Sequence, residues 1–458
     1  MAGPSDALER PRVPLVRDAL ITIGTRFGLA ILIFSADVII ARALGPAAKG
    51  RFTLVLLYSQ LAALVVGWGM DQALAVVAGR GTEPARRALA NAIVWSVVVG
   101  GFAVVLSVWL YGIPASGPPN GPGVYVLPNL SGIQFVYAAL AIPGELFFAF
   151  GLFALLGRRA VGAYSAIRIL RAAVLLGAIV ATAAIARLSL DVALVINLVT
   201  LVTTIVAILI AARRHGILGG RPSSTVLLEE LRFGSRALVG TLAERLQYRA
   251  DTFIVNAMLG VLATGIYSVT SGLAETLWYV PNALALVMLS RAVDPRADAG
   301  RIAATLTRVT VAIVALTAIP TFVLGPRLVR FVYGPSFVDA AVALRLILPG
   351  VVAYSVVAIL TRYITGVGRP GITTLIMSTG LAVNIAANLV LVPRLGINGA
   401  AISSSISYGL TALITLFVFR RLAGRGWLET LVIRRTDVRA AGRAVVKAAG
   451  RGPGRPDR

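Results

Sequence analysis

The sequence has no cysteine and only one histidine, His215. Without cysteine the chain can form no disulfide, no thiolate nucleophile and no cysteine-based metal site. One histidine cannot build a histidine metal cluster, so we expect neither a metal nor a cofactor. The sequence also lacks a Walker-type phosphate-binding loop, and we therefore expect that this chain does not hydrolyse ATP.

Charge is scarce as well. Charged residues make up 14% of the chain, 58% of the residues are hydrophobic, and the mean hydropathy is +0.87. A soluble domain is about a quarter charged, so the composition predicts a membrane protein. The formal charge of +24 is almost entirely arginine, since Lys49 and Lys447 are the only lysines. Most arginines lie in short connections between apolar blocks, which indicates membrane topology rather than nucleic-acid binding.

The apolar residues form continuous blocks of about 20 residues, the length of a helix that crosses a bilayer. Backbone amides inside lipid must bond within a helix or a closed barrel, and the blocks lack the short alternating strands of a barrel. The sequence therefore predicts an all-α, polytopic bundle. We expect about twelve spans, near residues 20–42, 52–78, 88–111, 132–156, 163–186, 190–212, 232–258, 265–289, 302–324, 343–366, 371–392 and 397–419.

The connections between these spans alternate between an arginine-rich set, which includes both termini, and an arginine-poor set. By the positive-inside rule the rich set is cytoplasmic, so we expect a plasma-membrane protein with both termini in the cytoplasm. The expected parts are a cytoplasmic segment at 1–17, six-helix lobes at 18–212 and 232–420, a cytoplasmic linker at 213–231 and a basic cytoplasmic tail at 421–458.

The two lobes share a short repeat. Leu44-Gly45 and Leu259-Gly260 are each followed by four residues, a second glycine and, two positions later, an aromatic residue. Each copy joins the first and second span of its lobe. Six spans per lobe would give both lobes the same orientation, related by an axis along the membrane normal. Transporters commonly bind their substrate between such lobes.

The predicted span at 232–258 is unusually polar. In a helical projection of this span, its polar side chains share one continuous arc. They are Glu244, Arg245, Gln247, Tyr248, Arg249, Asp251, Thr252 and Asn256. A helix with such a face must line water or other protein, because a charge inside lipid costs several kcal/mol.

Ten charged residues within the predicted spans are candidate site residues. The candidate headgroup-binding arginines are Arg26, Arg168, Arg171, Arg245 and Arg249. The candidate acids, which would pair with arginines or bind a coupling cation, are Asp37, Glu145, Glu244, Asp251 and Glu275. The guanidinium fork suits phosphate, so the arginine-rich set predicts an anionic, phosphate-bearing substrate. Alternatively, these charges form buried pairs that only fix helix packing. Arg362 is left out because it lies close enough to a span end to snorkel.

Three segments resemble a known family. They are Leu44–Leu74, Phe233–Leu273 with its mid-helix Asp251, and Val332–Arg421 with Gly368-Arg369-Pro370 and the paired Asn384 and Asn388. These segments are similar to the polysaccharide-transporter, or oligosaccharide flippase, branch of the multidrug/oligosaccharidyl-lipid/polysaccharide (MOP) exporter superfamily. The resemblance covers nearly all of residues 15–421.

The resemblance implies a two-lobed bundle around a central cavity that works by alternating access. Its substrate would be an undecaprenyl-pyrophosphate-linked oligosaccharide, moved from the cytoplasmic to the outer leaflet for O-antigen, capsule or exopolysaccharide synthesis. Membrane lipids, glycan polymerases and glycosyltransferases are the expected partners. Peptidoglycan-precursor flippases of the superfamily usually have two further helices, which this sequence lacks.

Other functions fit the sequence less well. A cation-coupled multidrug exporter of the same superfamily would favour acids and aromatics over excess arginine. A membrane glycan polymerase, which is an enzyme, would usually carry acids and bases on an outer loop. The longest predicted outer loop, 112–131, has Tyr125 as its only ionisable side chain. An unrelated twelve-helix transporter would show a charged, Gly-rich loop after its second span, and a scaffold protein would leave the polar span unexplained.

Overall fold

The computed structural model describes residues 15–112, 129–293 and 298–433, with side chains from Phe27 onward except at residues 111, 112, 286 and 290. Helices make up nearly all of this part of the chain, and it contains no strand. The α-helices are α1 (Leu15–Val66), α2 (Met70–Gly79), α3 (Thr82–Gly112), α4 (Gly132–Gly157), α5 (Val161–Ile185), α6 (Leu190–Arg214), α7 (Ser224–Thr276), α8 (Tyr279–Ala292), α9 (Ala299–Val332), α10 (Ala340–Gly366), α11 (Pro370–Leu395), α12 (Ile397–Ala423) and α13 (Trp427–Leu431). Ten of these helices are long and apolar enough to cross a membrane.

The predicted spans all fall on helices, but the two longest helices each hold more than one span. Helix α1 covers the first span and most of the second, and α7 covers the seventh and half of the eighth. Each bends at the repeated glycine: Gly45 has φ 74° and ψ 174°, and Gly260 has φ 83° and ψ −177°. A side chain is strained at such positive φ, which explains why glycine stands at both bends.

Two spans predicted as single helices are broken. The predicted span 52–78 is interrupted between Val66 and Met70, where Trp68 and Gly69 both have positive φ. The predicted span 265–289 is interrupted between α7 and α8. Apolar periodicity continues across both breaks, so hydropathy alone could not reveal them. The predicted linker 213–231 ends in helix, because α7 already begins at Ser224.

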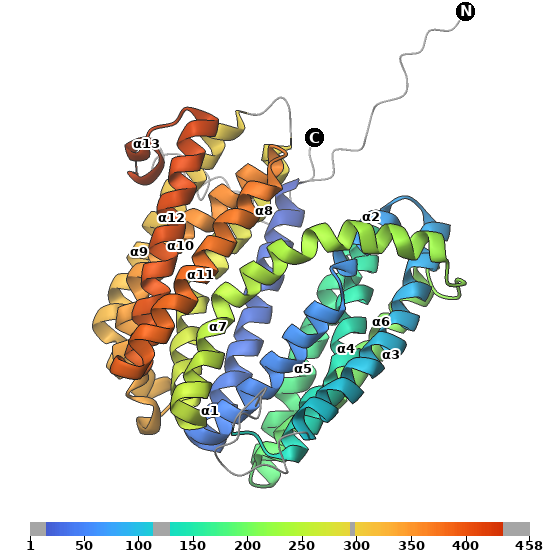
Figure 1. Ribbon diagram of the computed structural model, residues 1–458, viewed down its shortest axis with the longest axis horizontal. Coiled ribbons are helices and arrows are strands. Elements are labelled where there is room, and N and C mark those ends of the chain that lie inside the picture. The colour runs from blue at the N-terminus through green and yellow to red at the C-terminus, as the bar shows by residue number, and fades with distance from the viewer. Residues whose placement is uncertain (1–14, 113–128, 294–297, 434–458) are drawn as a thin grey trace, which may run out of the picture.

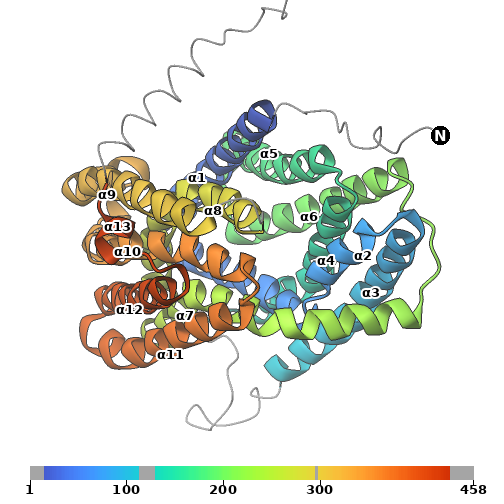
Figure 2. The ribbon, with the colours of Figure 1, turned by 90° about the horizontal axis from the view of Figure 1, so that it is seen from above.

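The bundle consists of two groups of helices with α1 and α7 between them. In Figure 1, α2–α6 lie on one side and α8–α13 on the other, and Figure 2 gives the same grouping from above. Buried apolar residues form one large core in the second group and two smaller cores in the first. We call the end of the bundle with the Gly45 and Gly260 bends the kink end. The opposite end, where residues 215–223 join α6 to α7, is the linker end.

Reciprocal glycines pack the two halves together at the kink end. A Cβ on Gly50 would lie 2.0 Å from the carbonyl oxygen of Val261, and one on Gly265 would lie 1.8 Å from that of Pro46. The repeat relates Gly50 to Gly265 and Pro46 to Val261, so each half makes the same contact on the other. Only a residue without a side chain permits this backbone approach.

Helix α7 also touches the first half near the linker end. A Cβ on Gly69 would lie 2.3 Å from the carbonyl oxygen of Gly234, and one on Gly234 would lie 2.4 Å from that of Trp68. The Gln72 side chain donates to the hydroxyl of Thr241 over 2.8 Å. Helix α7 is therefore held against the first half at both of its ends, and its middle carries the polar residues predicted from the sequence.

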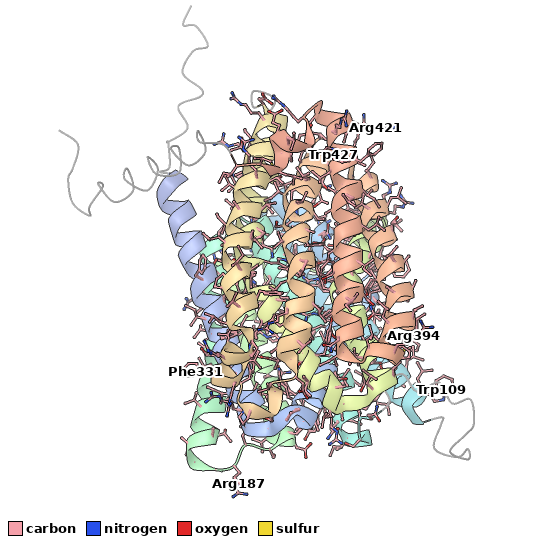
Figure 3. All side chains as sticks on the ribbon, turned by 90° about the vertical axis from the view of Figure 1, so that its left-hand side faces the viewer. Trp109, Arg187, Phe331, Arg394, Arg421 and Trp427 are labelled. Atoms are coloured by element: carbon pink, nitrogen blue, oxygen red, sulfur yellow. The ribbon has the colours of Figure 1, made fainter. Side chains whose placement is uncertain are left out.

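The outer surface fits a bilayer. Figure 3 shows exposed Trp109 and Phe331 near Arg187 and Arg394 toward the kink end, and Trp427 beside Arg421 at the linker end. Aromatic and basic side chains at both borders of an apolar band are typical of membrane interfaces. Helix α1 begins at the linker end, and helix α12 ends there (Figure 1). An even number of crossings requires this arrangement.

Candidate functional site

Four of the candidate charges, Arg245, Arg249, Arg171 and Glu145, lie well inside their helices. Along α7, about 16 Å of helix separates Arg249 from the kink at Gly260, and about 16 Å separates Arg245 from the close contact at Gly234. On α5, Arg171 lies about 15 Å from the first residue at the linker end, and on α4 Glu145 lies about 18 Å from the last. These side chains are therefore too deep to reach either interface.

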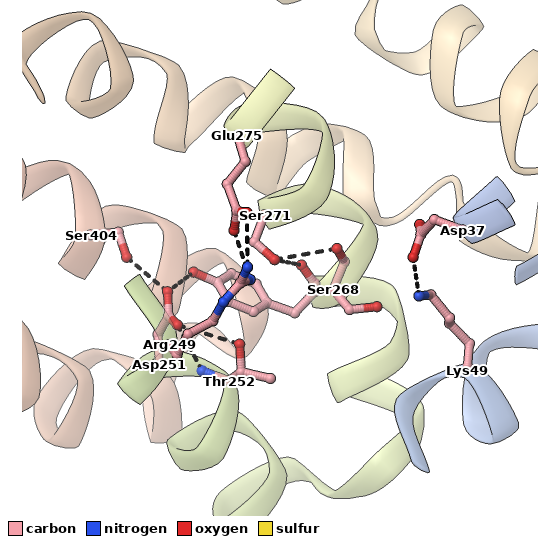
Figure 4. A network of polar contacts seen from close by, with 10 residues as sticks. Asp37, Lys49, Arg249, Asp251, Thr252, Ser268, Ser271, Glu275 and Ser404 are labelled. Carbon is pink, nitrogen blue, oxygen red and sulfur yellow. Dashed lines mark hydrogen bonds and ion pairs between the residues drawn. The ribbon is translucent and has the colours of Figure 1, made fainter. Parts of the chain in front are cut away.

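Arg249 and Glu275 form a two-pronged ion pair between the two segments of α7. Arg249 Nη1 lies 2.7 Å from Glu275 Oε1, and Arg249 Nη2 donates to Oε2 over 2.9 Å. About a third of each side chain is exposed, 32% and 31%. Figure 4 shows this pair on α7 opposite Asp37 of α1. The pair thus links the two segments of α7 and stays partly exposed.

Arg171 and Glu145 form the corresponding pair inside the first half. Arg171 of α5 donates to Glu145 of α4 through both Nη1, over 3.0 Å, and Nη2. The Arg171 guanidinium also stacks over the ring of Phe148, 4.3 Å from its centre. Glu145 is 7% exposed and Arg171 is 19% exposed. This arrangement matches the packing alternative that the sequence left open.

Arg168 and Arg245 are not neutralised by an ion pair within the described part of the chain. Arg168 donates to the Tyr164 hydroxyl over 3.3 Å and lies over its ring at 5.4 Å, which supplies no negative charge. Arg245 is exposed on α7 and is electrostatically coupled to Asp71 of α2, without a direct ion pair. Of the candidate arginines whose side chains are described, these two are free to bind an anion. The side chain of Arg26 lies outside the described residues.

Asp251 is fully buried within the second half. Its carboxylate accepts hydrogen bonds from the Tyr267 hydroxyl, from the Ser404 hydroxyl over 3.1 Å and from the Thr252 amide over 2.8 Å. The network continues through Asn384, which donates to Ser404 over 3.4 Å (Figure 4 shows its Asp251 end). The several donors around this buried carboxylate hold α7 against α12.

Glu244 pairs with a residue that the sequence analysis left out. Arg362 Nη2 of α10 lies 3.1 Å from Glu244 Oε1, and both side chains are about a third exposed. Arg362 therefore has a partner on α7 that its position near a span end did not predict. The reason is that helix α10 brings it beside α7, and this proximity has no signal in the local sequence.

Asp37 takes part in the contacts that join the halves near the kink end. It binds Lys49 of α1 and accepts a hydrogen bond from the Tyr333 hydroxyl over 3.2 Å. Nearby, Arg42 donates to the backbone carbonyls of Val332, over 2.7 Å, and of Phe331. Sequence analysis found Asp37 but missed its partners, because Lys49 and Tyr333 lie in connections that read as solvent-facing ends.

This chain is similar in sequence to known proteins. A sequence model described as polysaccharide biosynthesis protein matches residues 39–342, about two thirds of the chain. The chain belongs to this polysaccharide biosynthesis protein family. An uncharacterized membrane protein from Methanocaldococcus jannaschii is 26% identical over 102 residues, which are 22% of this chain and 20% of that protein. The similarity to that relative therefore covers only a small part of either protein.

Solved structures show the same fold. An inward-facing multidrug resistance MATE family transporter of the MOP superfamily has a TM-score of 0.65 at 17% identity, over 88% of this chain and 98% of that one. An outward-facing one has a TM-score of 0.63 at 16% identity, over 89% and 95%. A MOP superfamily transporter from Pyrococcus furiosus has a TM-score of 0.58 at 17% identity, over 88% and 96%. The predicted all-helical membrane fold is confirmed, since it is the fold of these transporters. The polysaccharide biosynthesis family agrees with the family that the sequence resembles.

Proposed function

We propose that this protein is a flippase for an undecaprenyl-pyrophosphate-linked oligosaccharide, which it moves from the cytoplasmic to the outer leaflet. The observation that carries the proposal is that two arginines on membrane helices, Arg168 of α5 and Arg245 of α7, have no ion-pair partner within the described chain. A guanidinium group without a counter-charge favours an anionic partner, and its planar fork suits a phosphate. The family's role in polysaccharide biosynthesis supports the sugar part of the substrate.

The partly exposed Arg249–Glu275 ion pair suggests how the headgroup moves from one arginine to the next. Arg249 is a third exposed and bound to Glu275, so an entering phosphate can compete with the carboxylate for the guanidinium. Arg171 is largely covered by Glu145 and Phe148 and has no room for such an exchange. Arg168, Arg245 and Arg249 therefore bind the headgroup in this proposal, Arg171 stiffens the first half, and the lipid tail stays in the bilayer.

Outward movement of a pyrophosphate does not require ATP. With the cytoplasm negative, each negative charge moved outward gains about 2.3 kcal/mol per 100 mV. This orientation places the linker end in the cytoplasm of a plasma-membrane protein, where the arginine-rich connections favour it. Enzymes that build the lipid-linked sugar on that side, and a glycan polymerase on the other, are the partners that the proposal requires.

A cation-coupled multidrug exporter is the second candidate, because the similar solved structures include MATE multidrug transporters. The Pyrococcus furiosus transporter is described as having a binding pocket of reverse polarity that suggests a different function. Pocket polarity can thus separate functions within one fold. The un-neutralised arginines of this chain favour an anionic substrate over a cationic drug.

The decisive experiment measures flipping in proteoliposomes of an undecaprenyl-pyrophosphate-linked oligosaccharide. We expect wild type to flip it and Arg168→Gln/Arg245→Gln to lose at least about 100-fold, since each lost charged hydrogen bond is worth roughly 1.5–3 kcal/mol. Arg187→Gln/Arg394→Gln is the matched control: it removes two exposed arginines at the kink end (Figure 3) and should flip like wild type.

Two outcomes would contradict the proposal. One is flipping by the Arg168→Gln/Arg245→Gln protein at the wild-type rate. The other is a wild type that leaves the lipid in place but exports cationic dyes against a proton or sodium gradient, which would establish the multidrug exporter instead.

A further inference from the structure

A second basic site lies at the linker end, far from the charges between the halves. A pocket of about 480 Å³ opens between the start of α3 and residues 219–224, which lead into α7. Its lining includes Arg86, Arg87 and Arg221, against one acid, Glu83. Glu83 is already bound to Arg87 over 3.0 Å, so the pocket keeps an excess of two positive charges.

The remaining two arginines have no carboxylate partner within the described chain. Arg86 donates through Nε to the carbonyl oxygen of Gly216 over 2.7 Å, which holds its guanidinium in place and leaves its outer nitrogens available. Arg221 is exposed at the pocket wall. The pocket therefore presents a held guanidinium on α3 and an exposed guanidinium on the linker, a combination suited to the oxygens of a phosphate group.

Close packing and hydrogen bonds hold the backbone that lines the pocket. A Cβ on Gly220 would lie 2.3 Å from the carbonyl oxygen of Arg86, so the linker packs directly on α3. Asn91 of α3 accepts from the Ser223 amide over 2.9 Å and donates to the Ser223 carbonyl over 3.1 Å. Ser223 does not cap α7 with its side chain, so the first amides of that helix add positive potential at the pocket.

We propose that this pocket, lined by Arg86, Arg87, Arg221 and the linker, binds a phosphate group, either of an anionic phospholipid or of a soluble phosphate compound. The position of the pocket at the start of α7 supports a role in regulating the movement of that helix. Helix α7 runs without a break from Ser224 to the bend at Gly260 and carries Arg245 and Arg249 on the way. A phosphate that bridges α3 and the linker ties the start of this helix to the first half. This site does not depend on the identity of the transported substrate.

The test measures lipid binding to the purified, delipidated full-length protein, titrated with tail-labelled phosphatidylglycerol or phosphatidylcholine. We expect Arg86→Gln/Arg221→Gln to weaken phosphatidylglycerol binding about tenfold or more. Arg213→Gln/Arg214→Gln, which removes two exposed arginines from the same end outside the pocket, should bind like wild type. Arg221→Gln alone should weaken binding partially and covers the case in which the Arg86 change disturbs the linker.

Inorganic phosphate distinguishes the two sources. If phosphate stabilises the wild type but not Arg86→Gln/Arg221→Gln, while phosphatidylglycerol is bound no better than phosphatidylcholine, the site holds a soluble phosphate. The proposal is overturned if Arg86→Gln/Arg221→Gln and Arg221→Gln bind both probes like wild type, or if the control variant loses as much. Because the readout is occupancy and not transport, failure here leaves the flippase proposal standing.

Discussion

Helices α1 and α7 hold equivalent places in the two halves and differ in chemistry much more than in shape. Both bend at a glycine with nearly the same backbone angles, and both contribute one glycine to the reciprocal contact at the kink end. Where α7 has Arg249 and Asp251, the repeat places Phe34 and Ala36 in α1. Phe34 packs edge-on against Tyr333.

The residues that shape the backbone of these helices are therefore different from the residues that carry charge. The bends and close approaches require glycine and recur in both halves, because no other residue tolerates those positions. The charges impose no such backbone constraint and differ between the halves: α7 carries five of the ten candidate charges, and the candidates of the first half are spread over α1, α4 and α5. The ion pairs differ between the halves as well. The Arg171–Glu145 pair of the first half is enclosed, whereas the Arg249–Glu275 pair of the second half is partly exposed.

The largest expected effect tests what the halves share. Gly50→Val and Gly265→Val should each force the halves apart at the kink end, since a Cβ there overlaps a backbone oxygen of the other half. The chain has no cysteine, so spin labels on cysteines introduced at positions 187 and 394 can report the separation. We expect an increase of several ångström in both variants.

Gly272→Ala is the control for this measurement, because a Cβ at Gly272 meets nothing within 4 Å. A change in distance in only one of the two valine variants would show that the contact is not reciprocal. No change in either would mean that the halves do not meet through these glycines.

The next largest effect tests where the halves differ. Glu145→Gln should destabilise the protein by about 3–5 kcal/mol, because it leaves the enclosed Arg171 without its counter-charge. Glu275→Gln should cost less, about 1 kcal/mol, because both side chains of the Arg249–Glu275 pair are about a third exposed. Thermal unfolding of the purified variants would measure both, and equal losses would refute the distinction between an enclosed and an open pair.

The smallest effect concerns Glu244 and Arg362. Both side chains are about a third exposed, so we expect their coupling to contribute only about 0.2–1 kcal/mol. A double-mutant cycle of Glu244→Gln, Arg362→Gln and the double variant, read by thermal unfolding, isolates this value. A coupling as large as the loss in Glu145→Gln would place this pair among the enclosed ones.

Hydropathy was enough to predict a helical bundle in which every predicted span falls on a helix. It did not predict the count, because α1 and α7 each hold more than one predicted span and ten helices of the described chain are long and apolar enough to cross a membrane. The polar arc of residues 244–256 also predicted that α7 makes polar contacts inside the protein, as it does in the pairs Arg249–Glu275 and Glu244–Arg362. Each of these features is a property of residues close together in the chain. The breaks near Trp68 and at the α7–α8 junction escaped prediction, because apolar side chains continue through them and only the backbone angles change.

Composition and hydropathy are enough to predict an all-helical membrane protein with two related halves and charges inside its spans, because lipid imposes apolar length and makes every deep charge conspicuous. Which of these charges are paired depends on the packing of the helices. In the sequence all four candidates, Arg168, Arg171, Arg245 and Arg249, are arginines within predicted spans and look alike. In the structure Arg171 and Arg249 are paired with glutamates, and Arg168 and Arg245 are not. Pairing depends on which helices lie side by side, and that is set by packing across distant segments of the chain.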